Sequence, residues 1–93
     1  MAPENSGPPK LDERNYSYWK ARMAGYLEAL YTIYWEVTEN AVVGEWSEDQ
    51  LKWNVRAKNT LFDAISEEIF ARVHSKKTSH EIWEALESYL CWF

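Results

Sequence analysis

The feature that most constrains this chain is a stripe of large apolar side chains at helical spacing near the start of its sequence. From the stretch NYSYWKARM at residues 15–23 onward, they recur every three or four positions: Tyr16, Trp19, Met23, Leu27, Leu30 and Tyr34. This spacing places them on one face of an amphipathic helix. The stripe therefore predicts a helix that follows Asn15 as its N-cap, fades near residues 30–32 and buries its aromatic side in a core.

The rest of the chain carries further helix signals. The run YTIYWEV at residues 31–37 has the composition of a strand, but no second strand is predicted to pair with it, so we expect a short helix or turn. A loop follows over residues 38–45, with Gly44 as its hinge. Capping boxes at Ser47 with Gln50 and Thr78 with Glu81 start two further helices, and Ser66 starts a short one between them. The last helix carries an apolar stripe formed by Ile82, Trp83, Leu86, Tyr89 and Leu90.

Together these signals predict an all-α fold, a compact bundle of four or five short helices. The chain has 93 residues, which favours one domain. Residues 1–10 contain three prolines and predict a disordered lead-in, and residues 11–93 form the helical domain.

The predicted helix over residues 47–65 has two apolar stripes. The first is expected to face the core and consists of Leu51, Val55, Phe62 and Ile65, with Leu61 at its border and Lys58 lying among them. The second consists of Trp53, Ala57 and Ala64. Either the helix is sandwiched and buries both stripes, or the second stripe is an exposed contact for another subunit.

The net charge of −5 disfavours binding to a phosphate backbone. Six acids and no base occur between Glu28 and Asp49. A cluster formed by Arg72, Lys76 and Lys77 is a weak candidate for nucleic-acid contact, and otherwise belongs to a solvated helix surface.

No residue pattern points to chemistry. His74 and His80 are separated by a predicted helix start, and Cys91 is a single cysteine, so we expect neither a metal site nor a catalytic pair, no cofactor and no enzymatic activity. A single cysteine fits a reducing compartment. Because there is neither a signal-peptide pattern nor an apolar run of membrane-spanning length, we expect a cytoplasmic protein without membrane contact.

Several segments in collinear order, NYSYWKARM, WEV, ENAVVGEW and NVRAKNTLFDAISEEIFARVHSKKTSHEIWEAL, resemble the N-terminal part of the Gag polyprotein of plant copia-type LTR retrotransposons. The resemblance covers roughly residues 11 to 87. The positions that match the family's pattern are Asn15, Tyr16, Trp19, Met23, Trp35, Trp46, Asn54, Ala57, Asn59, Leu61, Phe62, Arg72, Val73, Thr78, Glu81, Ile82, Trp83 and Leu86.

The resemblance implies a capsid-like helical module that associates with itself or with other Gag chains. In the family, RNA contact relies largely on a downstream zinc knuckle, and this sequence has no such motif. Alternative functions are an RNA-binding module and a degenerate remnant without activity. After Leu86 the chain departs from its relatives and ends on large apolar residues, so we expect a domain truncated at its C-terminus. The candidate interface combines the second stripe with this tail: Trp53, Ala57, Ala64, Cys91, Trp92 and Phe93.

Overall fold

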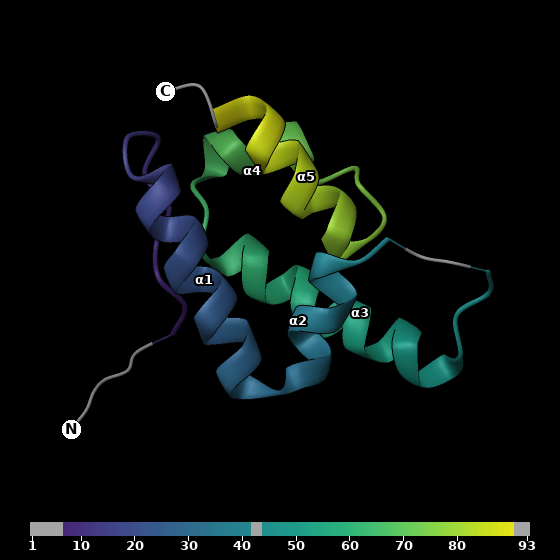
Figure 1. The fold of residues 1–93 in the computed structure, drawn as a ribbon. Helices are drawn as coiled ribbons and strands as arrows, with labels where there is room; N and C mark the ends of the chain where they lie inside the picture. Colours follow the sequence, from purple (N-terminus) through teal and green to yellow (C-terminus); the bar gives the residue numbers. More distant parts are fainter. Residues whose placement is uncertain (1–6, 42–43, 91–93) are drawn as a thin grey trace.

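A computed structural model describes residues 7–41 and 44–90 of the chain. It has five helices: α1 (Tyr16–Leu30), α2 (Thr32–Glu39), α3 (Glu48–Asp63), α4 (Glu67–Val73) and α5 (Ser79–Leu90). The described residues contain no strand. The predicted all-α bundle is therefore confirmed, and residues 32–39 are helical. In Figure 1, α1 and the α4–α5 pair lie at the sides of the bundle, and the short α2 lies between α1 and α3.

The core forms where α2 packs against α1, α3 and α5. The rings of Trp19 and Trp83 are 5.5 Å apart between their centroids, and Trp35 meets Trp83 edge-on at 5.3 Å. Tilted and edge-on contacts of this kind stabilise aromatic pairs beyond the area that they bury. Three helices, α1, α2 and α5, each contribute one of these tryptophans. The aromatic residues therefore join helices that are distant in the sequence.

The stripe at the start of the chain is mostly buried, with one exception. Tyr16, Trp19, Met23 and Leu27 are buried on α1, as predicted, but Leu30 is 41% exposed. The helix ends at Leu30 because Tyr31 adopts an extended conformation, with φ −158° and ψ 133°. The chain changes direction there, so the predicted continuation of the stripe through Leu30 is wrong.

Asn15 precedes α1 as predicted, but it does not cap the helix through its side chain. Its Oδ1 accepts a hydrogen bond from the backbone N–H of Asp12 at 2.8 Å, and its Nδ2 donates to the carbonyl of Lys10 at 3.3 Å. Asn15 therefore stabilises the turn that leads into α1. The expected N-cap hydrogen bond of Asn15 is wrong.

The structure confirms the predicted side-chain caps at the starts of α3 and α4, and the one at α5 in part. At α3, the Ser47 hydroxyl accepts from the N–H of Gln50 and the Gln50 side chain accepts from the N–H of Ser47, which is the predicted capping box. The Ser66 hydroxyl likewise accepts from the N–H of Ile69 at the start of α4. The box at α5 is only half formed. Thr78 accepts from the N–H of Glu81, but the Glu81 carboxylate accepts from the N–H of Lys77 rather than from that of Thr78.

The segment before α1 packs against the bundle. The N–H of Leu11 donates to the carbonyl of Ala64 at 2.7 Å, and Leu11 is buried. The carbonyl of Pro9 accepts from the indole N–H of Trp19 at 2.9 Å, and Lys10 Nζ donates to the carbonyl of Asp63. Residues 9 and 10, which the sequence assigned to the lead-in, thus already contact α1 and α3.

Candidate interaction surfaces

Helix α3 has an inner face that is covered and an outer face that is not. The inner face carries Asn54, Ala57 and Leu61, all buried, and Ala64 just beyond the helix is buried with them. The outer face carries Leu51 and Val55, each 52% exposed. The expectation that this stripe faces the core is therefore wrong for Leu51 and Val55, whereas its other members, Phe62 and Ile65, are partly buried against the core.

The second stripe, for which burial and an exposed contact were the two predicted alternatives, belongs to the inner face. Ala57 and Ala64 have almost no exposed surface. Trp53 is half-buried, and its ring lies 5.4 Å from that of Tyr31 and 5.5 Å from that of Tyr34. The candidate interface of Trp53, Ala57 and Ala64 is thus an internal contact of the bundle, and these alanines are unavailable to a partner.

Arg56 also contacts the tryptophan, with its guanidinium carbon 5.2 Å from the ring centroid of Trp53. A guanidinium over an indole face is an attractive cation–π contact. Trp53 is therefore held by aromatic rings on one side and a cation on another.

The outer face of α3 continues onto α4 through an aromatic contact. The rings of Phe62 and Phe70 meet edge-on with centroids 4.8 Å apart, and Phe70 stacks on His74 at 5.4 Å. Phe70 remains 38% exposed. Leu51, Val55 and Phe62 recur on one side of α3, with Lys58 between Val55 and Phe62, and Phe62 is partly buried against the core. We call these three residues together with Phe70 the outer strip. The tail residues of the predicted interface, Cys91, Trp92 and Phe93, lie outside the described residues.

A buried polar network joins α2, α3 and α5 behind the inner face. Asn54 Oδ1 accepts from the N–H of Ser79 at 2.8 Å, and Asn54 Nδ2 donates to the carbonyl of Lys77 at 3.4 Å. Thr38 donates to the carbonyl of Tyr34, so the 2.6 Å contact between the Ser79 and Thr38 hydroxyls has Ser79 as donor. Buried polar groups need such partners. Only Asn54 of this network was singled out by the family pattern, because single hydroxyls give no periodic signal.

His80, which is half-buried, extends this network. Its Nδ1 lies 3.0 Å from the carbonyl oxygen of Thr38, which can only accept, so Nδ1 carries the proton in this contact. Its Nε2 lies 3.3 Å from a carboxylate oxygen of Glu84. The ring therefore connects the end of α2 to α5. His74 is exposed.

The residues of the family pattern fall mainly in the core. Those that are buried are Tyr16, Trp19, Met23, Asn54, Ala57, Leu61, Val73, Ile82, Trp83 and Leu86. Asn15, Trp35, Trp46, Phe62 and Thr78 are half-buried, whereas Asn59, Arg72 and Glu81 are exposed. The pattern therefore marks residues that shape the fold, and it does not outline one surface site.

The basic cluster is not a uniformly positive surface. The Arg72 guanidinium lies over the ring of Tyr89, with its carbon 4.5 Å from the centroid. Lys76 lines a surface pocket together with Glu81 and Glu84. Neighbouring carboxylates reduce the attraction of such a cluster for phosphate groups. The structure therefore gives no specific observation in favour of RNA contact by Arg72, Lys76 and Lys77.

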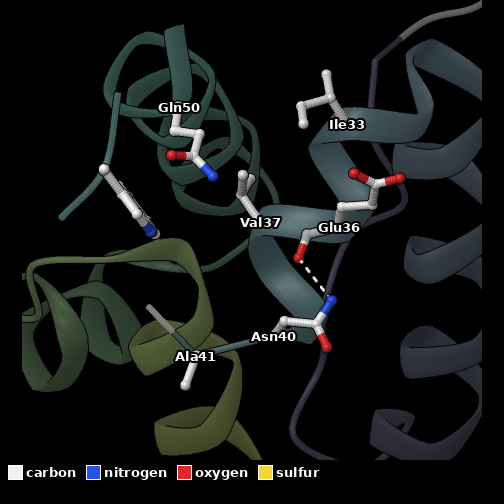
Figure 2. A pocket seen from close by; sticks show the side chains of 7 residues that line it. Ile33, Glu36, Val37, Asn40, Ala41 and Gln50 are labelled. Carbon is white, nitrogen blue, oxygen red and sulfur yellow. Dashed lines mark hydrogen bonds between the residues drawn. The ribbon is translucent and has the colours of Figure 1, made fainter. Parts of the chain in front are cut away.

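A pocket of about 230 Å³ lies between α2 and the start of α3. In Figure 2, Ile33 and Val37 project from α2 toward it, and Gln50 approaches from α3. Two of its polar side chains already have hydrogen bonds within the chain, since Asn40 donates to the carbonyl of Glu36 and Gln50 accepts from the N–H of Ser47. In the described part of the chain, no group of three or more His, Cys, Asp or Glu residues could hold a metal ion. Nothing in the pocket therefore defines a ligand.

No helix within residues 7–41 and 44–90 has both the length and the hydropathy of a membrane span. Comparison of the chain with protein-family models, curated proteins and solved structures finds no match.

Proposed function

We propose that this chain is a non-enzymatic helical module that binds other protein chains, as a capsid-like lobe of the Gag type does. The Gag-like part of this proposal rests on the resemblance of the sequence to Gag of plant copia-type retrotransposons. The surface that we propose to bind the partner is the outer strip.

The observation that carries the proposal is the exposure of Leu51 and Val55. They lie one turn apart on the same face of α3, and about half of each side chain is open to solvent. Single exposed apolar residues are common on protein surfaces, but contiguous apolar patches mark interaction sites. Here Leu51 and Val55 are neighbours on α3, and beyond Lys58 the contact of Phe62 with the exposed Phe70 adds apolar surface on α4.

The composition of the outer strip also fits an interface. Aromatic side chains are effective interface anchors because they bury much area with little loss of conformational entropy. Phe70 is such a side chain, held edge-on against Phe62 and stacked on His74. A partner would therefore meet a surface that is already ordered.

Sedimentation velocity of the purified chain over a wide concentration range tests the proposal. We expect the weight-average sedimentation coefficient to rise with concentration, and the double variant Leu51→Ser with Val55→Ser to remove that rise. A matched control is the variant Ser17→Ala, since Ser17 is exposed on α1, far along the chain from the outer strip. A chain that stays monomeric at every concentration would contradict self-association. Association that requires added RNA would favour the nucleic-acid alternative.

A further inference from the structure

We propose that the partner of the outer face of α3 is a second copy of this chain, and that the two α3 helices pair antiparallel about a two-fold axis near position 53. In this pairing Leu51 lies on Val55 of the other copy, and Glu48 lies beside Lys58 of the other copy. The inference rests on the proposed function and specifies its partner and geometry.

The positions of four residues on α3 lead to this arrangement. At 3.6 residues per turn, Glu48, Leu51, Val55 and Lys58 fall within an arc of about 80° around the helix axis. Position 53 lies midway in the sequence between Leu51 and Val55, and also midway between Glu48 and Lys58. Trp53 itself points to the opposite side of the helix, toward Tyr31 and Tyr34.

A two-fold axis converts this symmetry within one helix into contacts between two helices. In an isologous interface every contact occurs twice: if residue i of one copy contacts residue j of the other, then residue j of the first copy contacts residue i of the other. An antiparallel pair centred on position 53 therefore forms two Leu51–Val55 contacts and two Glu48–Lys58 contacts. A parallel pair in register would instead place Glu48 against Glu48 and Lys58 against Lys58, which is repulsive.

The two charged residues are available for such contacts. The ion pairs among the described residues join Asp12 to Arg14, Lys20 to Glu87 and His80 to Glu84, so neither Glu48 nor Lys58 takes part in one. Glu48 is exposed in the first turn of α3, and Lys58 is half-exposed beside the outer strip. A lysine among apolar side chains is thus explained by a carboxylate from the second copy.

The first turns of α3 are also accessible to another molecule. In Figure 1 this part of the helix, drawn in teal, lies at the periphery of the bundle, away from α4. The contact is small, because each copy contributes two half-exposed apolar residues at its centre. Stable complexes bury about 800 Å² per partner, so we expect a weak, reversible dimer.

Charge reversal tests the arrangement, measured by sedimentation velocity together with urea unfolding of each variant. Lys58→Glu places two like charges together at two symmetric positions, and should raise the dimer dissociation constant roughly tenfold. The double variant Glu48→Lys with Lys58→Glu exchanges the two charges and should restore the dissociation constant to within roughly threefold of the original. Lys76→Glu is the matched control, since it makes the same change in net charge at an exposed position after α4.

The outcomes separate this inference from the proposed function. If the chain self-associates but Lys58→Glu is no weaker than Lys76→Glu, the antiparallel pairing is wrong and the proposed function stands. The same conclusion follows if the double variant is as stable to urea as Lys58→Glu but does not regain association. If the unaltered chain is a monomer throughout, both this pairing and self-association are overturned.

Discussion

The inner and outer faces of α3 carry apolar side chains of similar kind, but α2 and α5 cover only the inner one. Leu61 on the inner face has no exposed surface, whereas Leu51 on the outer face is 52% exposed. The same residue type on the same helix thus serves two purposes, one in the core and one at the surface. The difference in exposure arises from the neighbouring helices, which pack on one face of α3 and leave the other open.

Truncating the inner leucine should have the largest effect on stability. Leu61→Ala removes a fully buried side chain and leaves a cavity, which we expect to lower the free energy of unfolding by about 2 to 5 kcal/mol. Urea unfolding followed by circular dichroism at 222 nm measures the loss. A loss of less than about 1 kcal/mol would mean that the inner face is not the core side of α3.

Trp53 tests the boundary between the two faces. Its contacts with Tyr31, Tyr34 and Arg56 lead us to expect that Trp53→Ala lowers the free energy of unfolding by roughly 2 to 3 kcal/mol, less than for a fully buried tryptophan. The same urea titration measures the change. If Trp53→Ala instead weakens self-association at unchanged stability, Trp53 is part of an interface and the assignment of the faces must be reversed.

The buried polar network gives a third, smaller effect on the inner side. Asn54→Ala leaves the N–H of Ser79 without its hydrogen-bond acceptor at the start of α5, so we expect a loss of about 1 to 3 kcal/mol. Asn59→Ala is a control on the same helix, because Asn59 is exposed. Equal unfolding free energies for the two variants would show that the network contributes nothing to stability.

The helices and most of the core could be predicted from the sequence because both depend on local signals. Spacings of three and four residues identify the buried side of α1 and α5, and the Ser47–Gln50 and Ser66 caps set the starts of α3 and α4. The predicted role of the first stripe on α3 was wrong for Leu51 and Val55, and the two alternatives for the second stripe stayed open, because a helix with two apolar stripes satisfies helical periodicity either way. The choice depends on where α2 and α5 pack, which is a non-local property.

Lys58 contained a signal that could have distinguished the two stripes of α3. A lysine in the middle of an apolar stripe is poorly suited to a core, since a buried ammonium needs a partner. The stripe without a charge, Trp53 with Ala57 and Ala64, is the one that the structure buries. The role of His80, by contrast, could not be predicted from the sequence. Its contact with Thr38 joins α5 to α2 across distant positions in the chain, and no spacing rule points to it.

The outer leucine should show the smallest effect on stability and completes the comparison with Leu61. Leu51→Ala shortens a side chain that is already half in solvent, and alanine favours the helix, so we expect a change of at most about 0.5 kcal/mol in the free energy of unfolding. The same substitution should reduce the concentration dependence of the sedimentation coefficient, because Leu51 lies at the centre of the proposed contact. A large loss of stability would place Leu51 in the core, in contradiction to its exposure. Unchanged stability with unchanged sedimentation would leave α3 with an exposed apolar face that takes no part in association, and the partner surface would then have to be sought elsewhere on the molecule.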